Sequence, residues 1–451
     1  MTGDLFRPIF VPDPFREAVS GRAWLQAMLD AEAALAVAGA RVGLVPAEAA
    51  EEIANCCDAD RFDVEEIGHR GRGAGNPAPA LVRALTGEVS KTSEEAARHV
   101  HRGATSQDIT DTAAMIVSGR ALDLILAETD AIAAACARLA GEHRDTLMAG
   151  RTLLQQALPT TFGLKAAGWL ISVLEARGGL RGVRERGLAA QLGGAAGTLA
   201  SLGDDGLPIL REFAGELGLA EPVVPWHTDR MRIVIVGDGL SLLSGVLEKI
   251  SRDVILLSQT EVGEVAEPAA EGRGGSSTLP HKRNPILSVT AAASTRRVRD
   301  LCHTLRTAAP QEHERAAGAW HAEWEALSDA LALTGGAASN VREVLEGLEV
   351  HPGRMRRNLE ATKGMLLAEN VTTALSEKLG RLRAHDLVEG ACRRALRENR
   401  HLREELVEDR DIQEALTEDG IDAALDPAGY LGSAGAFVDR ALRHYREGEP
   451  S

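Results

Sequence analysis

The segment at residues 274–285 places glycine, hydroxyl, cation and amide groups close together in the chain. It reads Gly-Gly-Ser-Ser-Thr-Leu-Pro-His-Lys-Arg-Asn-Pro. Its glycines, serines and prolines are ordinary turn residues, so a surface turn is the simplest interpretation. A hydroxyl beside a cation can also take a proton from carbon once a mobile loop closes and excludes water. The candidate catalytic and substrate-binding residues here are Ser276, Ser277, Lys282 and Asn284.

A second segment, residues 101–112, reads His-Arg-Gly-Ala-Thr-Ser-Gln-Asp-Ile-Thr-Asp-Thr and lies just before a long apolar stretch. Thr105 and Ser106 offer hydroxyl donors there, and Asp108 or Asp111 could cap the helix that follows. A helix N-terminus with free N–H groups and nearby hydroxyls is a site for a carboxylate. A plain capping sequence is the alternative interpretation.

Two further segments suggest ligand sites that their spacing does not support. Residues 312–325 contain histidines and glutamates, but they match no recognised metal-ligand pattern. We therefore expect a helix carrying Trp320 and Trp324, and no metal. Residues 69–77 look loosely like a phosphate loop, but no strand precedes them, so a nucleotide site is weakly indicated. No cofactor is expected.

The two segments with hydroxyl groups resemble signatures of the fumarase/aspartase superfamily. Those signatures are Gly-Ser-Ser-x-x-Pro-x-Lys-x-Asn-Pro and His-x-Gly-x-Thr-Ser-x-Asp-x-x-Asp-Thr. Residues 150–163 and the Gly-Gly-Ala-Ala-Gly-Thr turn within 191–199 resemble two more superfamily segments. The resemblance implies that Ser276 is the catalytic base and that Thr105 and Ser106 bind a substrate carboxylate. It adds these residues near the substrate: His101, Asn76, Arg151, Thr152, Gln156 and Thr198.

The chain departs from part of this superfamily in the segment at 150–163. Adenylosuccinate and argininosuccinate lyases carry a histidine directly after the threonine, where this chain has Leu153, and several relatives carry another where it has Gln156. An imidazole is a good proton donor near neutral pH, and neither a leucine nor an amide replaces it. The departure counts against the nucleotide and arginine branches. It leaves the general acid open, with His101 and His281 as candidates.

The pattern of proline and apolar residues predicts an all-α protein. Proline is absent between Pro79 and Pro159 and between Pro225 and Pro268, and helix interiors exclude proline. Apolar residues recur at helical spacing over 114–142 and 233–262, which predicts long helices. Loops are expected near 66–79, 192–207, 218–230, 264–285 and 347–356.

The resemblance adds a domain organisation to these helices. It implies three helical domains with a central long-helix bundle that forms the core of a homotetramer. The loop near 347–356 and the start of the long helices near residue 110 place these domains at 1–110, 111–346 and 347–451. The resemblance further implies that each active site takes its motif regions from different subunits. The serine segment alone would then not make a site.

Composition narrows the choice of partners and compartment. The formal net charge of −16 argues against nucleic acid or an anionic membrane as a partner. Five cysteines, an odd number without metal-like spacing, indicate free thiols in a reducing compartment. The N-terminus has no apolar signal region, and no run of 18 apolar residues occurs. We expect a cytoplasmic protein that spans no membrane.

The resemblance implies an enzyme acting on a small polycarboxylate. Segments 151–155, 164–167 and 312–324 are most similar to its cycloisomerase branch, which implies closure of an unsaturated polycarboxylate to a lactone. One alternative is a lyase that eliminates ammonia or an amine from an aspartate-like or succinyl substrate. Another is a non-catalytic structural protein on the same fold.

Overall fold

The computed structural model describes residues 3–270, 274–275, 278–279 and 281–448. The chain divides into two compact units. Unit 1 comprises Met1–Asp130, Glu175–Glu248 and Thr290–Asn340. Unit 2 comprises Ala131–Leu174, Lys249–Val289 and Val341–Ser451. The three-domain division expected from the sequence stays a prediction.

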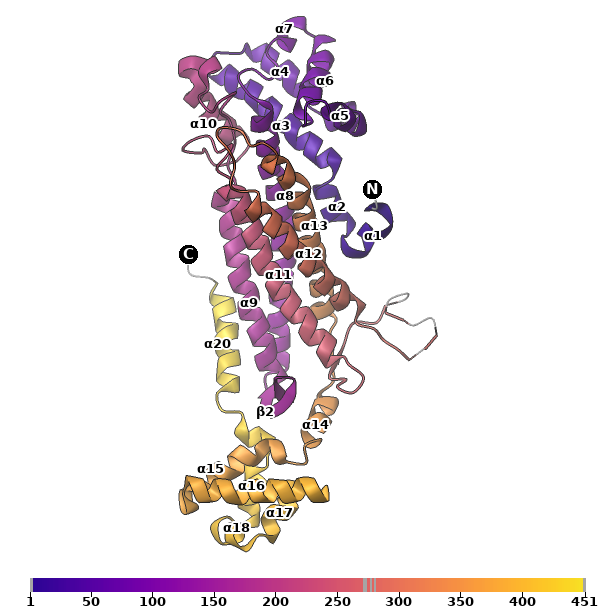
Figure 1. The fold of residues 1–451 in the computed structure, drawn as a ribbon, viewed down its shortest axis with the longest axis vertical. Helices are drawn as coiled ribbons and strands as arrows, with labels where there is room; N and C mark the ends of the chain where they lie inside the picture. Colours follow the sequence, from indigo (N-terminus) through magenta and orange to yellow (C-terminus); the bar gives the residue numbers. More distant parts are fainter. Residues whose placement is uncertain (1–2, 271–273, 276–277, 280, 449–451) are drawn as a thin grey trace. The chain divides into compact units, whose positions relative to one another are not determined.

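Helices form most of the described chain (Figure 1). The first elements are α1 (Gly3–Phe10), α2 (Asp13–Ala18), α3 (Gly21–Arg41), α4 (Ala47–Cys56), η1 (Ala59–Arg61), α5 (Val64–Gly71), α6 (Ala78–Ser90) and α7 (Glu94–Ala97). The long helices are α8 (Ser106–Glu142), α9 (Phe162–Gly182), α11 (Met231–Leu257), α12 (Ile286–Thr307) and α13 (Ala319–Glu346).

Shorter elements separate the long helices and complete the chain. Those between the long helices are β1 (Leu147–Thr152), β2 (Gln155–Thr161), η2 (Val183–Gly187), η3 (Ala200–Asp205), α10 (Gly206–Glu216) and β3 (Val265–Ala266). The C-terminal elements are β4 (Glu349–Val350), α14 (Pro352–Glu360), η4 (Met365–Leu367), α15 (Ala368–Leu379), α16 (Arg381–Glu398), α17 (Leu402–Glu408), α18 (Arg410–Ala415), α19 (Glu418–Ala424), η5 (Pro427–Tyr430) and α20 (Ala434–Glu447). The all-α prediction is confirmed, since the strands form only two short pairs, β1–β2 and β3–β4, in the described part.

The two long helices predicted from periodicity lie where the sequence placed them. In α11, Val236, Leu240 and Leu243 are fully buried, at the spacing that places side chains on one helix face. This helix ends at Leu257 and not near 262. A turn follows, in which Gly263 has a φ of 57° and Glu264 N donates back to Leu257 O at 2.8 Å.

Unit 1 depends on two glycines in α13 for a close approach of its N-terminal segment. A Cβ added at Gly336 would lie 1.9 Å from Phe10 O, and one at Gly335 would lie 2.1 Å from Phe15 Cδ1. Side chains at these positions would push the α1–α2 segment away. The pair of glycines therefore sets the distance between that segment and α13.

Unit 2 contains a hydrophobic cluster built by α15 to α19, with Val371, Leu375, Leu402 and Leu406 fully buried. The segment at 347–356, predicted as a loop, is partly regular. Its β4 pairs with β3, and α14 begins at Pro352, a residue whose fixed φ suits the first helical turn. The loop prediction was wrong there.

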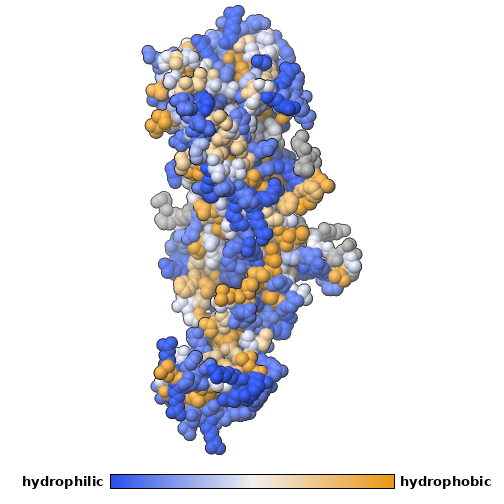
Figure 2. All heavy atoms as spheres, viewed as in Figure 1, coloured by the Kyte–Doolittle hydropathy of each residue, from blue (hydrophilic) through white to orange (hydrophobic). Residues whose placement is uncertain are grey.

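Apolar side chains also reach the surface along α11. Met231, Ile235 and Leu242 are exposed, Leu242 to 69%, and hydrophobic atoms appear beside polar ones on the face drawn in Figure 2. Within the described ranges, none of the helices combines the length and apolarity that crossing a membrane requires.

Candidate active site

The N-terminus of α8 has the form of a carboxylate site in unit 1. Ser106 is the first residue of the helix and Thr105 precedes it, and both are half-buried. Thr105 N donates to Asp108 Oδ2 at 2.8 Å, so of the two capping candidates, Asp108 and Asp111, it is Asp108 that caps the helix. Neither hydroxyl has a hydrogen-bond partner among the described residues. Both remain available at the positive end of the helix dipole.

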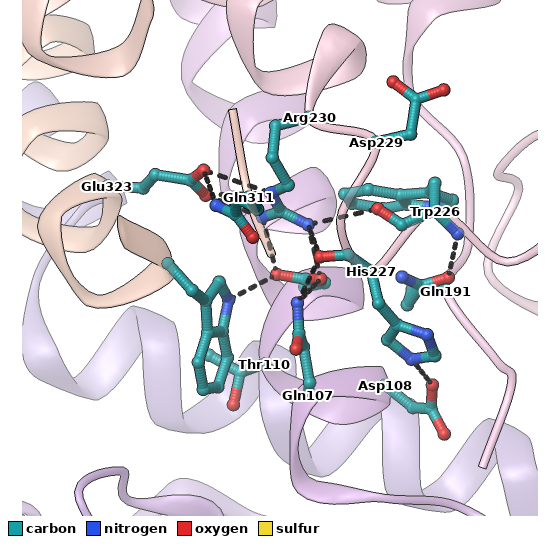
Figure 3. A network of polar contacts seen from close by, with 12 residues as sticks. Gln107, Asp108, Thr110, Gln191, Trp226, His227, Asp229, Arg230, Gln311 and Glu323 are labelled. Carbon is teal, nitrogen blue, oxygen red and sulfur yellow. Dashed lines mark hydrogen bonds and ion pairs between the residues drawn. The ribbon is translucent and has the colours of Figure 1, made fainter. Parts of the chain in front are cut away.

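Asp108 also joins this helix end to the glycine turn at 191–199. Its carboxylate accepts the backbone N–H groups of Gly193 and Gly194, each at 2.9 Å. Its Oδ1 lies 2.6 Å from His227 Nε2, and a dashed line joins these two side chains in Figure 3. Two segments that the sequence singled out, about ninety residues apart, are therefore brought together by one buried carboxylate.

His101 occupies a constrained position in the same unit. Its backbone has a φ of 59°, and its Nδ1 lies 2.6 Å from Oε1 of Glu32 on α3. The Glu32 side chain has 0% exposure and the His101 side chain 19%. Burial alone lowers the pKa of His101, but the hydrogen bond to Glu32 and the charges of Glu32 and Asp108 raise that pKa overall.

A buried ion-pair network lies beside this cluster (Figure 3). Arg230, with 1% side-chain exposure, donates to Asp111 at 2.7 and 2.9 Å and to Glu323 at 2.6 and 3.0 Å. Trp320 Nε1 donates to Asp111 at 2.9 Å. Glu323 and Trp320 thus hold the start of α13 in place. The helix expected around Trp320 and Trp324 is confirmed from Ala319 onward.

The remaining unit 1 residues predicted near substrate lie in loops. Asn76 Oδ1 accepts from the backbone N–H of Ala78, the first residue of α6, at 3.1 Å. A Cβ added at Gly75 would lie 3.5 Å from His321 Nε2, which places this loop beside α13. Thr198 is exposed and follows the glycine turn that Asp108 holds.

In unit 2, the β1–β2 hairpin carries Arg151, Thr152 and Gln156. Arg151 donates to both oxygens of Glu264, at 2.7 and 2.9 Å, and Glu264 is fully buried. Asn358 Nδ2 donates to the same carboxylate at 2.7 Å. Thr152 is exposed at the end of β1, and Gln156 donates to the Asn358 carbonyl at 3.0 Å. Arg151 is therefore already neutralised within unit 2.

A pocket of about 290 Å³ in unit 2 lies beside this hairpin and is lined by Arg151, Leu154, Lys165 and Asp253, among others. Lys165 Nζ lies 4.0 Å from Asp253 Oδ2, which also accepts from Trp169 Nε1 at 2.7 Å. Burial lowers the pKa of Lys165, and the charge of Asp253 partly opposes this. The lysine was not predicted from the sequence.

The described part of the 274–285 segment turns back on itself. Asn284 N and Nδ2 both donate to Gly274 O, at 2.9 and 3.1 Å, and Gly275 pairs with Arg283. Arg283 in turn donates to Glu349 at 2.7 and 3.0 Å. His281 and Lys282 are exposed. Ser276 and Ser277 lie outside the described residues, so their role stays a prediction.

The buried carboxylates Glu32 and Glu264 were missed by sequence reasoning. Glu264 lies in a stretch expected to be a loop. Glu32 could have been found, because it falls at helical spacing among Leu25, Met28 and Leu35, which are buried on α3. A charge at a core position of an apolar stripe requires a partner.

Comparison with known proteins assigns the family. Residues 11–299 match the Lyase family, and residues 364–441 match the family described as adenylosuccinate lyase C-terminus. The chain belongs to this lyase family, within the fumarase/aspartase superfamily that its motifs resemble.

Individual members of this family are similar to the chain along nearly its whole length. The chain is 48% identical to 3-carboxy-cis,cis-muconate cycloisomerase of Pseudomonas aeruginosa, over 98% of this chain and 96% of that protein. The 3-carboxy-cis,cis-muconate lactonizing enzyme of Pseudomonas putida superposes with a TM-score of 0.94 at 44% identity, covering 98% of this chain and 99% of that one. Nitrosuccinate lyase of Streptomyces davaonensis is 45% identical, over 97% of this chain and 94% of that protein.

Proposed function

We propose that the protein is a cytoplasmic cycloisomerase that converts 3-carboxy-cis,cis-muconate to a carboxymuconolactone, a step of aromatic degradation by the β-ketoadipate pathway. The observation that carries this proposal is the 48% identity, along nearly the whole chain, with a cycloisomerase of that substrate. The site chemistry supports it, because a tricarboxylate suits the hydroxyls and free N–H groups at the start of α8.

The reaction requires no redox change. One carboxylate oxygen of the substrate bonds to a carbon of the conjugated system, and the displaced electron pair moves toward a neighbouring carboxylate as an enolate-like intermediate. A proton then joins carbon. Thr105 and Ser106 would donate to the carboxylate that gathers charge, and fixed donors there lower the barrier because they bind the transition state more strongly.

We assign the proton exchange at carbon to Ser276, with Ser277 as the neighbouring candidate. Lys282 and Asn284 would stabilise the serine anion and the substrate carboxylates. Asn76, Thr152, Gln156 and Thr198 complete the proposed lining. Because Glu264 neutralises Arg151, we assign to Arg151 the orientation of the hairpin that carries Thr152.

We further propose that the protein works as a homotetramer whose active sites are shared between subunits. The exposed apolar residues Met231, Ile235 and Leu242 of α11 support this assembly, since exposed apolar side chains gathered on one helix often mark a surface that another subunit covers.

A second candidate function is favoured by the 45% identity to nitrosuccinate lyase. A lyase of that kind removes a proton from carbon and expels a leaving group to form a double bond, here nitrite from a succinate derivative. The same serine and the same carboxylate donors would serve both reactions. Release of ammonia or an amine from an aspartate-like substrate belongs to this class as well.

The test follows the ultraviolet absorbance of 3-carboxy-cis,cis-muconate mixed with the purified protein, beside Ser276→Ala and Ser277→Ala. We expect the wild type to remove the conjugated-diene band, with a loss of at least about 100-fold in kcat for Ser276→Ala and a smaller loss for Ser277→Ala. An unchanged band with the wild type, together with nitrite release from nitrosuccinate, would replace the first candidate with the second.

A further inference from the structure

The His101–Glu32 pair has a geometry that the reaction described above does not yet use. Nδ1 of the imidazole lies 2.6 Å from a carboxylate that is fully buried. Nε2 has no hydrogen-bond partner among the described residues, and the ring keeps 19% exposure. One ring nitrogen is therefore fixed by the protein, and the other faces no protein acceptor in the part of the chain described.

The hydrogen bond between Nδ1 of His101 and the Glu32 carboxylate determines the hydrogen-bonding role of Nε2. Nδ1–H of His101 donates a hydrogen bond to Glu32, because an ionised carboxylate only accepts hydrogen bonds. When the ring is protonated, Nε2 carries a proton as well and becomes a donor to an anion. His101 has a left-handed backbone, with a φ of 59°.

The charges around the ring all favour this protonated form. Glu32 faces it from α3 and Asp108 from α8. On its own segment, His99 and Arg102 contact each other at 3.1 Å. Asp108 is held in place by His227 and by backbone N–H groups of the glycine turn. Burial of the ring opposes these two carboxylates, and the pKa of His101 is nevertheless raised overall.

We propose that Glu32 is a positioning residue that holds His101 as an imidazolium, so that Nε2–H donates to a substrate carboxylate beside the N-terminus of α8. The proposal rests on the proposed function and deepens it, because it selects His101 over His281 as the second acidic group of the site. Glu32 itself does not touch the substrate.

The first measurement does not depend on turnover. Hydrogen–deuterium exchange at the histidine C2 carbon, followed by mass spectrometry against pH, gives the pKa of each histidine. Trypsin releases residues 99–102, His-Val-His-Arg, and fragment ions separate His99 from His101. We expect the His101 midpoint to lie above the ordinary value of about 6.5. In Glu32→Gln the His101 midpoint should fall by about one unit or more.

The second measurement is the pH profile of kcat/KM for 3-carboxy-cis,cis-muconate. Since the protonated ring is the active form, activity declines as pH rises through the His101 pKa. Glu32→Gln removes the charge that raises this pKa, so the decline should move to lower pH. At pH 8 we expect a loss of about 10-fold for each unit by which the pKa falls, and the loss shrinks as the pH is lowered. Glu32→Asp keeps the charge, so its decline should stay near that of the wild type while kcat falls because the ring is displaced.

The control is Glu95→Gln, which removes an exposed carboxylate 3.7 Å from His99. It should leave both the His101 midpoint and the pH profile of kcat/KM unchanged. Melting temperatures separate a folding defect from a defect in the site. An unchanged His101 midpoint or an unchanged alkaline decline in folded Glu32→Gln would overturn the proposal. A wild type that does not convert the muconate but shows the shifted midpoint would contradict the proposed function and leave the His101–Glu32 pairing standing.

Discussion

At the scale of single residues, buried charge is the feature with the largest energetic consequence. Arg230 neutralises Asp111 and Glu323, all with 1–2% exposure. Burial raises the pKa of Glu323, and Arg230 partly opposes this. The three side chains form a mutually dependent set, since removing the cation leaves two carboxylates without a counter-charge in a medium that solvates them poorly.

We predict that Arg230→Met destabilises unit 1 by about 3–5 kcal/mol, measured as a shift of the midpoint of urea unfolding. The matched control is Arg306→Met, which removes a surface pair with Asp238 at 2.6 Å, where both side chains are more than 40% exposed. Exposed pairs contribute about 1 kcal/mol or less. Equal shifts for the two variants would show that the buried network does not stabilise the fold.

Contacts between residues close together in the sequence could be predicted, and contacts between residues far apart could not. The hydroxyls at 105–106 and the cap at Asp108 could be predicted, because a capping motif is local in the chain. The partners of His101 and Arg151 could not be predicted, since Glu32 and Glu264 lie 69 and 113 residues away. No local pattern specifies which buried carboxylate a distant cation or imidazole meets.

At the scale of elements, the β1–β2 hairpin is the clearest element that the sequence did not reveal. Its two-residue turn is Leu153–Leu154, and both have positive φ, 51° and 66°. Hairpin turns of this geometry usually carry Asn-Gly or a similar pair, which is the signal sequence reasoning relies on. The long helices were predictable because the stretches without proline coincide with stretches in which apolar residues recur at helical spacing over many turns.

The close approach of the N-terminal segment to α13 gives an element-scale prediction. Gly336→Ala would place a Cβ 1.9 Å from Phe10 O, so the segment must shift, and we expect a loss of about 1–3 kcal/mol in unfolding free energy. Gly87→Ala is the control, because nothing lies within 4 Å of an added Cβ in α6. That variant should gain about 0.5–1 kcal/mol. Thermal melting of both proteins checks the pair, and a stable Gly336→Ala would contradict the packing argument.

At the scale of the whole molecule, the proposed tetramer is open to direct measurement. We predict a tetramer mass by light scattering for the wild type, and smaller species for Leu242→Glu, which places a charge on the exposed face of α11. Leu396→Glu on α16 is the control, since Leu396 has a similar exposure, 65% against 69%. A monomeric wild type, or equal behaviour of the two variants, would contradict the proposed interface.

The fold class could be predicted from composition and from the helical spacing of apolar residues, because helix formation depends on residues that are close together in the sequence. The assembly and the sharing of sites depend on which surfaces of different copies meet, and the amphipathic pattern of a single chain does not record this. Exposed apolar side chains on a long helix, such as Leu242 on α11, are the nearest physical sign of it.

The leucine turn of the hairpin has a consequence for protein engineering. Leu153 is 96% exposed and Leu154 73% exposed, and left-handed backbone costs roughly 1–2 kcal/mol per residue outside glycine. A redesign guided by stability would therefore replace this pair with Asn-Gly among its first choices. Such a variant would gain heat resistance at the turn beside Thr152, where the substrate is proposed to bind. Thermostable versions of this enzyme should therefore be selected for turnover as well as for melting temperature.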